Sequence, residues 1–335
     1  MDYVGRGSIE KLAGLLAPGS DVVVFTRKSI YARHETLVAP ALAQVTTHFY
    51  TDIEPNPARE AVQAAQDTLR GKKYSTIVAL GGGSVLDFAK AWRHYEGCKA
   101  PLIAIPTTAG TGSEATQFAV IYIEGIKASL DAPELLPEVA IVDSQLTERA
   151  PRALKATCAM DAYCQAIESY WAKRATAESR ELALEAIRLC RQHLVTAVNT
   201  PDAAANEGMA RAAHLAGQAI NISRTTAAHA LSYRITSQYG IPHGHAVALS
   251  IAGLFMANLP AIPEPQRLLE AMDIAESEVV THFHQLMEKI GLEWNIHALG
   301  IDAEDIATSV NEERLKNNPM QLSHNDLANI INETL

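Results

Sequence analysis

Short apolar runs alternate with helix-like stretches over the first 150 residues of this chain of 335 residues. The runs are rich in β-branched residues, and each predicts a strand. The predicted strands are Asp21–Thr26, Thr46–Tyr50, Thr76–Leu80, Leu102–Ile105 and Val139–Val142. Helices are predicted over Tyr31–Ala43, Pro57–Arg70 and Ser84–Tyr95, and a hairpin over Gln117–Tyr122 and Lys127–Leu130. Strands that alternate with helices are typical of a doubly wound, mainly parallel α/β sheet.

The pattern changes after Pro151. Strand-like runs nearly vanish there, and long segments with helical periodicity follow, such as Ser179–Val198 and Glu207–Ile220. We therefore predict an α/β domain over residues 1–150 and an all-α domain over residues 151–335. Ligands often bind between domains, so we expect the functional cleft at that junction.

The composition and charge of the chain limit the kinds of molecule that we expect it to bind. The chain has 48% hydrophobic and 20% charged residues, as globular proteins do, and a net charge of −10 at pH 7. That charge argues against nucleic acid or an anionic membrane, so local cations must capture any anionic substrate. Four irregularly spaced cysteines and an N-terminus without signal-peptide features predict a cytoplasmic protein. The most apolar stretch, Val247–Ile262, contains polar residues, is too short to span a bilayer and predicts a buried helix.

A run of three glycines and a serine, Gly81-Gly82-Gly83-Ser84, separates a predicted buried strand from a predicted helix. Glycine lets the backbone turn sharply and lets an anion approach main-chain N–H groups. The N-terminus of the following helix directs further N–H groups and its positive dipole end to the same place. The run therefore predicts a phosphate cradle, with a simple turn as the alternative. It matches neither the G-x-G-x-x-G fingerprint nor a Walker loop.

A second loop of small polar residues, Pro106–Glu114, follows the next predicted strand. Its hydroxyl and backbone N–H groups suit the phosphate and ribose of a nucleotide, although an ordinary Ser/Thr/Gly turn has the same composition. Two such loops after neighbouring strands favour nucleotide binding over coincidence.

Two spacings in the predicted helical domain suit metal ligands. Asp161 and Gln165 are four residues apart, so both point the same way on a helix and could share an ion. His229 and His243 lie among small apolar residues, where a buried imidazole without a partner is unfavourable, and Pro242 and Gly244 suggest a loop around His243. Each of these residues also has an ordinary structural interpretation. Asp161 could begin a helix, Gln165 could be solvated, and the histidines could be core residues.

Taken in this order, the two loops, Asp161 and the two histidines resemble the iron-containing, or group III, alcohol dehydrogenase family over nearly the whole chain. The resemblance implies a dehydroquinate synthase-like fold and a divalent metal, Fe²⁺ or Zn²⁺, held by Asp161, His229 and His243. Gln165 stands where the family usually has a fourth ligand, a histidine, so either its amide oxygen is a weaker ligand or the position is open. The resemblance also implies a nicotinamide dinucleotide, with contacts from Gly81, Gly82, Gly83, Ser84, Asp87, Thr107, Thr108, Thr111 and Ser113.

Within this family, the segments around Asp161 and His229 are similar to the phosphonoacetaldehyde reductase branch. This likeness implies an NAD(P)H oxidoreductase that reduces phosphonoacetaldehyde to 2-hydroxyethylphosphonate. Arg224, five residues before His229, is the candidate for binding the phosphonate, with an ordinary surface arginine as the alternative. Lys127 is expected to face the cofactor ribose or the substrate.

Two further points concern protons and cofactor choice. Solvent, Tyr233 or His245 could supply the proton that the product oxygen takes up. Arg27 and Lys28 follow the first predicted strand, where NAD-preferring members often have an Asp, so we expect NADPH rather than NADH.

Three alternatives remain open. They are a general group III alcohol dehydrogenase for another small aldehyde or alcohol, a relative of dehydroquinate synthase or glycerol phosphate dehydrogenase, and a non-catalytic binder in which Gln165 marks a decayed site. We also expect a homodimer.

Overall fold

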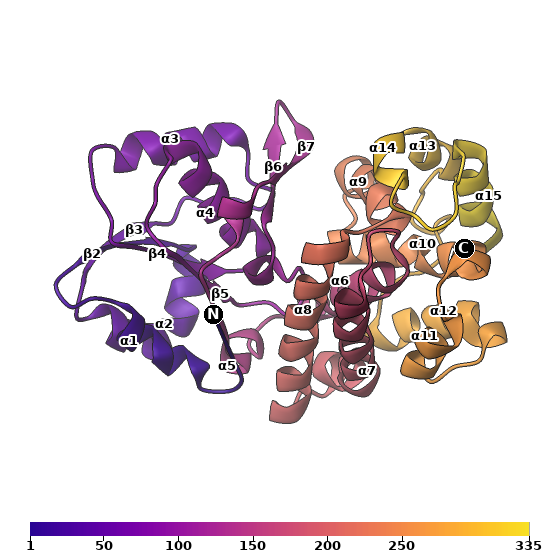
Figure 1. The fold of residues 1–335 in the computed structure, drawn as a ribbon, viewed down its shortest axis with the longest axis horizontal. Helices are drawn as coiled ribbons and strands as arrows, with labels where there is room; N and C mark the ends of the chain where they lie inside the picture. Colours follow the sequence, from indigo (N-terminus) through magenta and orange to yellow (C-terminus); the bar gives the residue numbers. More distant parts are fainter. Residues whose placement is uncertain (335) are drawn as a thin grey trace. The chain divides into compact units, whose positions relative to one another are not determined.

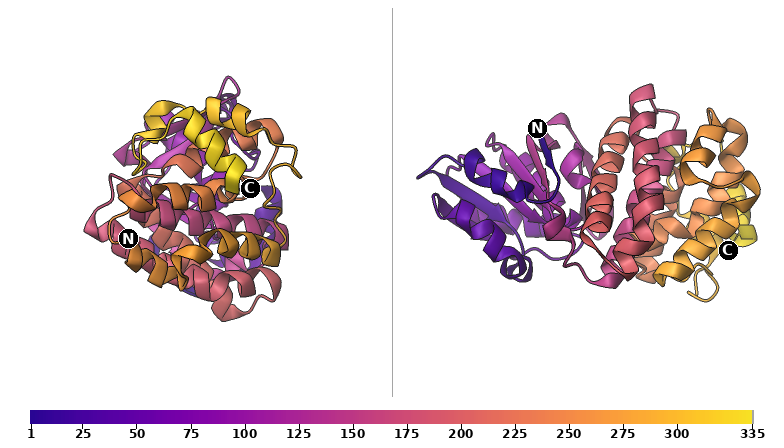
Figure 2. Two further views of the ribbon diagram at one scale, coloured as in Figure 1. Left: turned by 90° about the vertical axis from the view of Figure 1, so that its right-hand side faces the viewer. Right: turned by 90° about the horizontal axis from the view of Figure 1, so that it is seen from below.

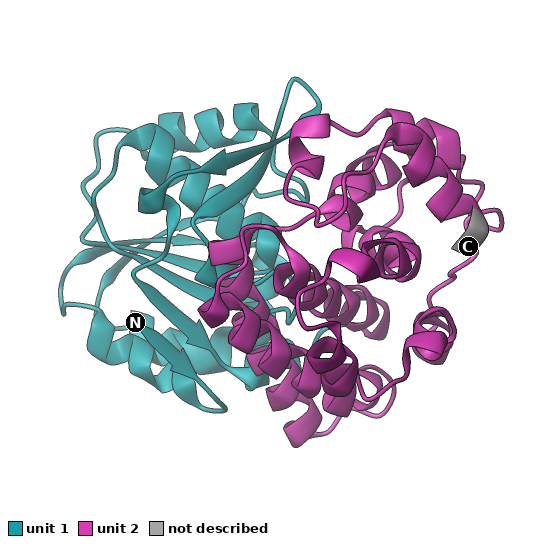
Figure 3. Ribbon diagram, turned by 45° about the vertical axis from the view of Figure 1, so that its right-hand side comes forward, with its two compact units in different colours: residues 1–150 teal, residues 151–335 magenta. Residues whose placement is uncertain are grey.

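The computed structural model describes residues 1–334, with side chains through residue 332. The chain forms two compact units, Met1–Ala150 (unit 1) and Pro151–Leu335 (unit 2), coloured separately in Figure 3. Each unit is described by itself below.

Unit 1 is built on a parallel sheet of six strands in the order β1-β8-β5-β4-β2-β3. The strands are β1 (Asp2–Val4), β2 (Asp21–Phe25), β3 (Thr46–Tyr50), β4 (Thr76–Gly81), β5 (Leu102–Pro106) and β8 (Val139–Val142). Five of them match the predicted strands within a residue or so. The sequence prediction missed β1, which is three residues long and pairs only with β8.

Helices cover both faces of this sheet, as Figure 1 shows. The elements are α1 (Lys11–Leu15) and α2 (Lys28–Leu42) on one face, and α3 (Arg59–Leu69) and α4 (Gly83–Glu96) on the other. Side chains alternate along β2, so Val22 and Val24 pack in one core with Val38 of α2. Val23 and Phe25 pack in the second core with Val85 of α4. A strand buried on both faces must be apolar throughout, which is why the sequence shows runs rather than alternation.

The predicted hairpin is also present. Strands β6 (Phe118–Ile123) and β7 (Ile126–Asp131) pair in antiparallel register around Glu124-Gly125, and short helix α5 (Ser144–Thr147) closes unit 1 after β8.

The described part of unit 2 contains helices and no strand. Its helices are α6 (Arg152–Trp171), α7 (Ala177–Asn199), α8 (Ala203–Ser223), α9 (Ala227–Tyr239), α10 (His243–Asn258), α11 (Pro265–Met272), α12 (Val279–Ile290), α13 (Ala303–Thr308), α14 (Glu312–Leu315) and α15 (His324–Thr334). The long helices α6, α7 and α8 pack against one another (Figure 2). Local capping fixes the starts of α7 and α8, because the Thr176 and Asp202 side chains accept backbone N–H groups there.

One helical stretch, His243–Ala261, is long and apolar enough to cross a membrane by length and composition. It is longer than the stretch Val247–Ile262, so the expectation that it would be too short was wrong. Of its most apolar window, 72% is buried by the rest of the protein. This burial agrees with the predicted core helix.

Candidate functional site

The two small-residue loops of unit 1 leave the sheet side by side. Gly81, the last residue of β4, is in register with Pro106 at the end of β5, and its carbonyl accepts the Thr107 N–H at 3.0 Å. Parallel strands end at the same edge of a sheet, where open α/β sheets usually bind ligands. The structure therefore brings the predicted nucleotide-binding residues of both loops together.

Gly82 and Gly83 act through their small size rather than through a sharp turn. Gly81 belongs to β4 and Gly83 begins α4, so only Gly82 lies between the two elements, and its φ of −77° is available to any residue. The expectation of a glycine turn was wrong in this respect. A Cβ on Gly82 would lie 3.1 Å from Thr108 Oγ1, and one on Gly83 would lie 2.9 Å from Thr111 Cγ2. The glycines thus let the two loops pack in contact, beside the N–H groups of the first turn of α4.

Beneath these loops lies a buried polar network centred on Lys90 of α4. Lys90 Nζ donates to the Ser113 carbonyl (2.5 Å) and hydroxyl (2.9 Å), and to the carbonyls of Thr116 (2.8 Å) and Phe118 (3.0 Å). Asp87 accepts the Ser113 hydroxyl proton at 2.5 Å and the Val120 N–H at 2.9 Å. Burial lowers the pKa of Lys90, although Asp87 and Glu114 act against this shift. Asp87 and Ser113 therefore fix the second loop, and direct contact with a cofactor stays a prediction for both.

The remaining predicted cofactor contacts of unit 1 lie near the same edge of the sheet. Arg27 precedes α2 and forms an ion pair with the exposed Glu54 at 3.4 Å. Ser84 Oγ accepts the Asn56 N–H at 3.3 Å. Lys127 lies on β7, and its charge acts on the Asp87 carboxyl group.

In unit 2, three predicted metal ligands from three helices converge. Asp161 lies in the middle of α6, His229 in the first turn of α9, and His243 at the first position of α10. His243 is therefore a helix residue rather than the loop residue expected from its Pro and Gly neighbours. Asp161 does not begin a helix, and it is buried. One possible ligand atom from each of the three residues lies within 4.8 Å of the others.

The distances suit a shared cation. Asp161 Oδ1 is 3.4 Å from His229 Nε2 and 3.9 Å from His243 Nε2. Two ligand atoms of one tetrahedral ion, each bonded at about 2.1 Å, would lie about 3.4 Å apart. Apart from this Asp161 contact, His229 Nε2 forms no hydrogen bond with the described residues, although it is buried. A buried nitrogen aimed at a carboxylate and a second imidazole is what a metal site without its ion would show, so these residues fit a divalent metal.

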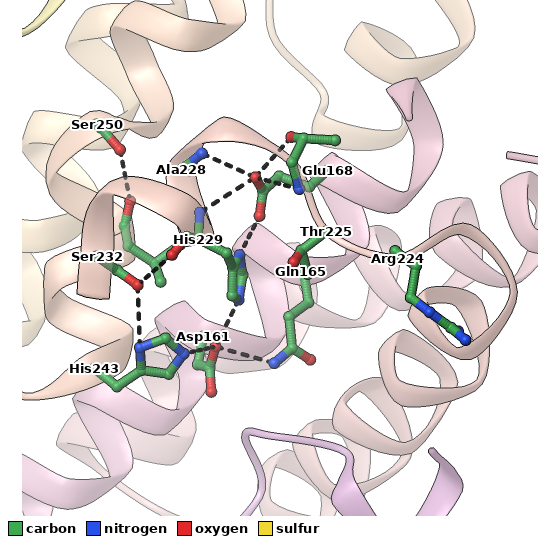
Figure 4. A network of polar contacts seen from close by, with 12 residues as sticks. Asp161, Gln165, Glu168, Arg224, Thr225, Ala228, His229, Ser232, His243 and Ser250 are labelled. Atoms are coloured by element: carbon green, nitrogen blue, oxygen red, sulfur yellow. Dashed lines mark hydrogen bonds and ion pairs between the residues drawn. The ribbon is translucent and has the colours of Figure 1, made fainter. Parts of the chain in front are cut away.

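Two further side chains set the tautomers of both histidines, as Figure 4 shows. The fully buried Glu168 accepts the Nδ1–H of His229, which turns Nε2 toward Asp161. Ser232 donates its hydroxyl proton to the His229 carbonyl at 2.7 Å, so its oxygen accepts from His243 Nδ1 at 3.3 Å. Metal-binding histidines commonly have such a partner on the other ring nitrogen.

Glu168 also anchors the start of α9. Its Oε1 accepts the N–H groups of Thr226 and Ala228, both at 3.0 Å, and the Thr226 hydroxyl proton at 2.7 Å. A carboxylate is favourable at a helix N-terminus. Burial lowers the pKa of His229, but the opposing effects of Glu168 and Asp161 are larger, so that the pKa is raised.

Gln165 is buried beside Asp161, so it is not a solvated surface residue. It donates Nε2–H to Asp161 Oδ1 at 3.0 Å, while its Oε1 has no hydrogen-bond partner among the described side chains and backbone. Whether Gln165 is a ligand stays a prediction.

The structure places the other predicted residues of unit 2 in different surroundings. His245 is buried, and its Nε2 contacts the Glu293 carbonyl at 2.5 Å, which occupies that nitrogen. Tyr233 is half-buried on α9, with the Arg314 guanidinium 4.2 Å above its ring. Arg224 ends α8, donates to the Asn221 carbonyl, and points away from Asp161 and His243 in Figure 4.

Sequence reasoning missed Lys90, Glu168 and Ser232. A signal existed for two of them. Glu168 lies seven residues after Asp161, and Lys90 lies three residues after Asp87, so each shares a helix face with a predicted site residue.

Comparisons with known proteins give the family that the chain matches. Residues 3–144 match the family described as iron-containing alcohol dehydrogenase, and residues 155–335 match the C-terminal part of the same family. A phosphonoacetaldehyde reductase from Streptomyces viridochromogenes is 31% identical in a match that covers 82% of this chain and 80% of that protein.

Two solved structures are similar over the whole chain. The sulfoacetaldehyde reductase from Bifidobacterium kashiwanohense in complex with NAD⁺ is 29% identical with a TM-score of 0.88, covering 100% of this chain and 96% of that one. A 1,3-propanediol oxidoreductase is 25% identical with a TM-score of 0.89, covering 100% and 98%. The predicted fold class is thereby confirmed.

Proposed function

This chain belongs to the iron-containing alcohol dehydrogenase family and is thus an oxidoreductase, and we propose that it reduces a small anionic aldehyde to a primary alcohol with NAD(P)H. The most specific form of this proposal is the reduction of phosphonoacetaldehyde to 2-hydroxyethylphosphonate. The names of two relatives support an anionic substrate, because phosphonoacetaldehyde and sulfoacetaldehyde both carry an acidic group one carbon from the carbonyl. The observation that carries the proposal is the convergence of Asp161, His229 and His243 around a buried nitrogen without a hydrogen bond.

The residues of unit 2 prepare a site for a carbonyl group. Asp161, His229 and His243 would hold a divalent ion, Fe²⁺ or Zn²⁺, which when bound polarises a carbonyl oxygen as a Lewis acid. Asp161 contributes the one formal negative charge of this set, and Glu168 and Ser232 hold both Nε2 atoms in the orientation that ligation requires. Three protein ligands leave a position for substrate, the usual arrangement in catalytic sites.

The residues of unit 1 would bind the hydride donor. The loops Gly81–Ser84 and Thr107–Ser113 offer hydroxyl groups and the N-terminus of α4 to a pyrophosphate. We favour NADPH, because Arg27 and Lys28 would attract a 2′-phosphate, although Glu54 offsets part of the Arg27 charge.

Water is the proton source that we favour for the product oxygen. His245 is the weakest candidate, because its Nε2 contacts the Glu293 carbonyl and its burial lowers its pKa. Tyr233 instead packs its ring against a guanidinium.

An assay of cofactor oxidation tests the proposal. NADPH and NADH oxidation would be followed with phosphonoacetaldehyde, sulfoacetaldehyde and propanal, before and after chelation and with metal added back. We expect turnover of an anionic aldehyde that is lost on chelation and restored by Fe²⁺ or Zn²⁺. Turnover of propanal alone would point to the second candidate, a general alcohol dehydrogenase, which the similarity to a 1,3-propanediol oxidoreductase favours. No turnover of any aldehyde would contradict both.

A further inference from the structure

Arg314, on the short helix α14, stacks its guanidinium on an aromatic ring. Its Cζ lies 4.2 Å from the centroid of the Tyr233 ring, and the residue is half-buried. No hydrogen bond or ion pair joins its guanidinium to another residue whose side chain the structure describes. Its acidic neighbour Glu313 is paired instead with Lys316, at 2.5 Å. A planar group with five N–H donors thus stacks on an aromatic ring, and no carboxylate among the described side chains pairs with it.

A second arginine close by shows the contrast. Arg234 follows Tyr233 in the chain and donates two hydrogen bonds to the Asp305 carboxylate, at 3.0 and 2.7 Å. The same region of unit 2 therefore contains one arginine neutralised by a carboxylate and one that stacks on a ring. Both guanidinium groups are charged, but Asp305 accepts N–H groups of Arg234, whereas no described side chain accepts from the stacked Arg314.

The position of Arg314 relates it to the metal ligands. Tyr233 lies four residues after His229 on α9, so the two residues share a helix face with Cβ atoms about 5–6 Å apart. Long side chains on a helix lean toward its N-terminus, which directs the Tyr233 ring toward the turn that carries His229. A guanidinium on that ring would then lie on the same side of α9 as His229, where a small molecule held by its carbonyl group at the metal ligands would meet it.

Hydrogen bonds fasten the Arg314 segment to the start of α9. Asn317 Nδ2 donates to the carbonyls of Ser223 and Thr225, at 2.8 and 2.9 Å. These two residues flank Arg224, whose φ of 63° and ψ of 171° fall in a region that favours glycine. Such a conformation costs on the order of 1–3 kcal/mol and persists only where its surroundings enforce it. Asn317 thus links the helix that carries Arg314 to the strained backbone at Arg224, just before α9.

We propose that Arg314, stacked on Tyr233, binds the anionic group of the substrate and makes the enzyme selective for small aldehydes that carry a phosphonate or sulfonate. Arg314 takes the role that the sequence suggested for Arg224, whose guanidinium contacts the Asn221 carbonyl. The planar fork of an arginine matches two oxygens of such a group, and charged hydrogen bonds of this kind are among the strong ones. This inference rests on the proposed function, because it names a residue that selects the substrate class of that same site.

Steady-state kinetics of Arg314→Met and Arg314→Lys test the proposal. The matched control is Lys316→Met, which removes an exposed cation two residues away that is already paired with Glu313. For Arg314→Met we expect kcat/KM for the anionic aldehyde to fall about 10- to 150-fold relative to that for propanal, because a charged hydrogen-bonded contact is lost. Arg314→Lys should recover part of this ratio, and Lys316→Met should leave it at the wild-type value.

A binding measurement separates this inference from the proposed function. Calorimetry with the metal-loaded protein would give dissociation constants for 2-hydroxyethylphosphonate and 2-hydroxyethanesulfonate. We expect binding at least about tenfold weaker in Arg314→Met, and the tighter of the two ligands identifies the anion. If the wild type turns over an anionic aldehyde but Arg314→Met keeps both the ratio and the affinity, the Arg314 proposal is wrong and the proposed function stands. If the wild type binds neither ligand and reduces only propanal, both are wrong.

Discussion

The two units each contain a buried polar network, and the two networks differ in whether they are complete. In unit 1, Lys90, Asp87 and Ser113 are bonded to one another and to the loop above them. In unit 2, the network around Asp161 leaves His229 Nε2 and Gln165 Oε1 without a hydrogen bond. Buried polar groups are nearly always satisfied in native proteins. Because the open atoms of unit 2 lie beside a carboxylate and a second imidazole that converge with them, this network fits a ligand site, whereas the complete network of unit 1 fits a scaffold.

The difference also explains why only one of these clusters suits a cation. The unit 1 cluster already contains an internal cation, the Lys90 ammonium, surrounded by oxygen acceptors. The unit 2 cluster directs one carboxylate oxygen and two imidazole nitrogens toward a common point with no cation of its own. Nitrogen and oxygen ligands of this kind suit Fe²⁺ and Zn²⁺.

Breaking the complete network should have the largest effect on stability. Lys90→Met leaves Asp87 and several carbonyls without their buried donor, so we expect a loss of about 3–5 kcal/mol in the free energy of unfolding of unit 1. Hydrogen exchange measured by mass spectrometry should show faster exchange over residues 113–123. Exchange in α6 and α9 and the metal affinity should stay at wild-type values. Unchanged protection of the loop would contradict the scaffold role.

Breaking the incomplete network should act on metal binding instead. Asp161→Asn removes the one charged member of the proposed ligand set, so we expect metal affinity to fall by more than about 100-fold, beyond the effect of losing a supporting group. Titration with Co²⁺ and competition with a chelator measure the metal affinity of this variant and of the wild type. Without metal, the free energy of unfolding should change less in Asp161→Asn than in Lys90→Met. A larger change in Asp161→Asn would contradict the assignment of unit 2 as the metal site and unit 1 as the scaffold.

A smaller loss of metal affinity is expected from the group behind His229. Glu168→Gln keeps the shape and can still accept from Nδ1, but removes the charge that holds the imidazole. We expect metal affinity to fall about 10- to 100-fold. Glu185→Gln, on the exposed face of α7, is the control, because Glu185 pairs only with an exposed arginine among its described contacts. An equal affinity in Glu168→Gln and Glu185→Gln would exclude a positioning role for Glu168.

Features that depend on a local run of residues could be predicted from the sequence, and features that depend on tertiary packing could not. Runs of four or more β-branched, apolar or aromatic residues located β2, β3, β4, β5 and β8, whereas the three residues of β1 carry too little pattern. Asp161 and His229 are 68 residues apart, so no local spacing could bring them together, and the family resemblance supplied that step. The pairing of Lys90 with Ser113 and of Arg314 with Tyr233 depends on tertiary packing, which neither periodicity nor a motif encodes.

Completing the unit 2 network should increase affinity. Gln165→His replaces the neutral amide beside Asp161 with the nitrogen ligand that the family usually has at this position, so we expect metal affinity to rise about tenfold. Chelator competition measures the change, and Gln165→Leu is the control that removes the amide without adding a ligand. An affinity that stays constant in both variants would mean that residue 165 does not approach the ion.

His34 shows that one buried nitrogen without a hydrogen bond does not by itself make a metal site. His34 of α2 is buried and its Nδ1 has no partner among the described residues, yet no metal-binding group of three described residues includes it. Burial, with smaller effects of Arg33 and Arg149, lowers its pKa from 6.5 to about 4. Between these values the unfolded chain binds a proton that the folded chain excludes, so stability falls as the pH drops below 6.5. We expect a loss on the order of 1 kcal/mol between pH 7 and pH 5.5, measured by urea denaturation of the metal-free protein. His34→Leu should remove this slope, and a slope equal to the wild type would locate the sensitivity elsewhere.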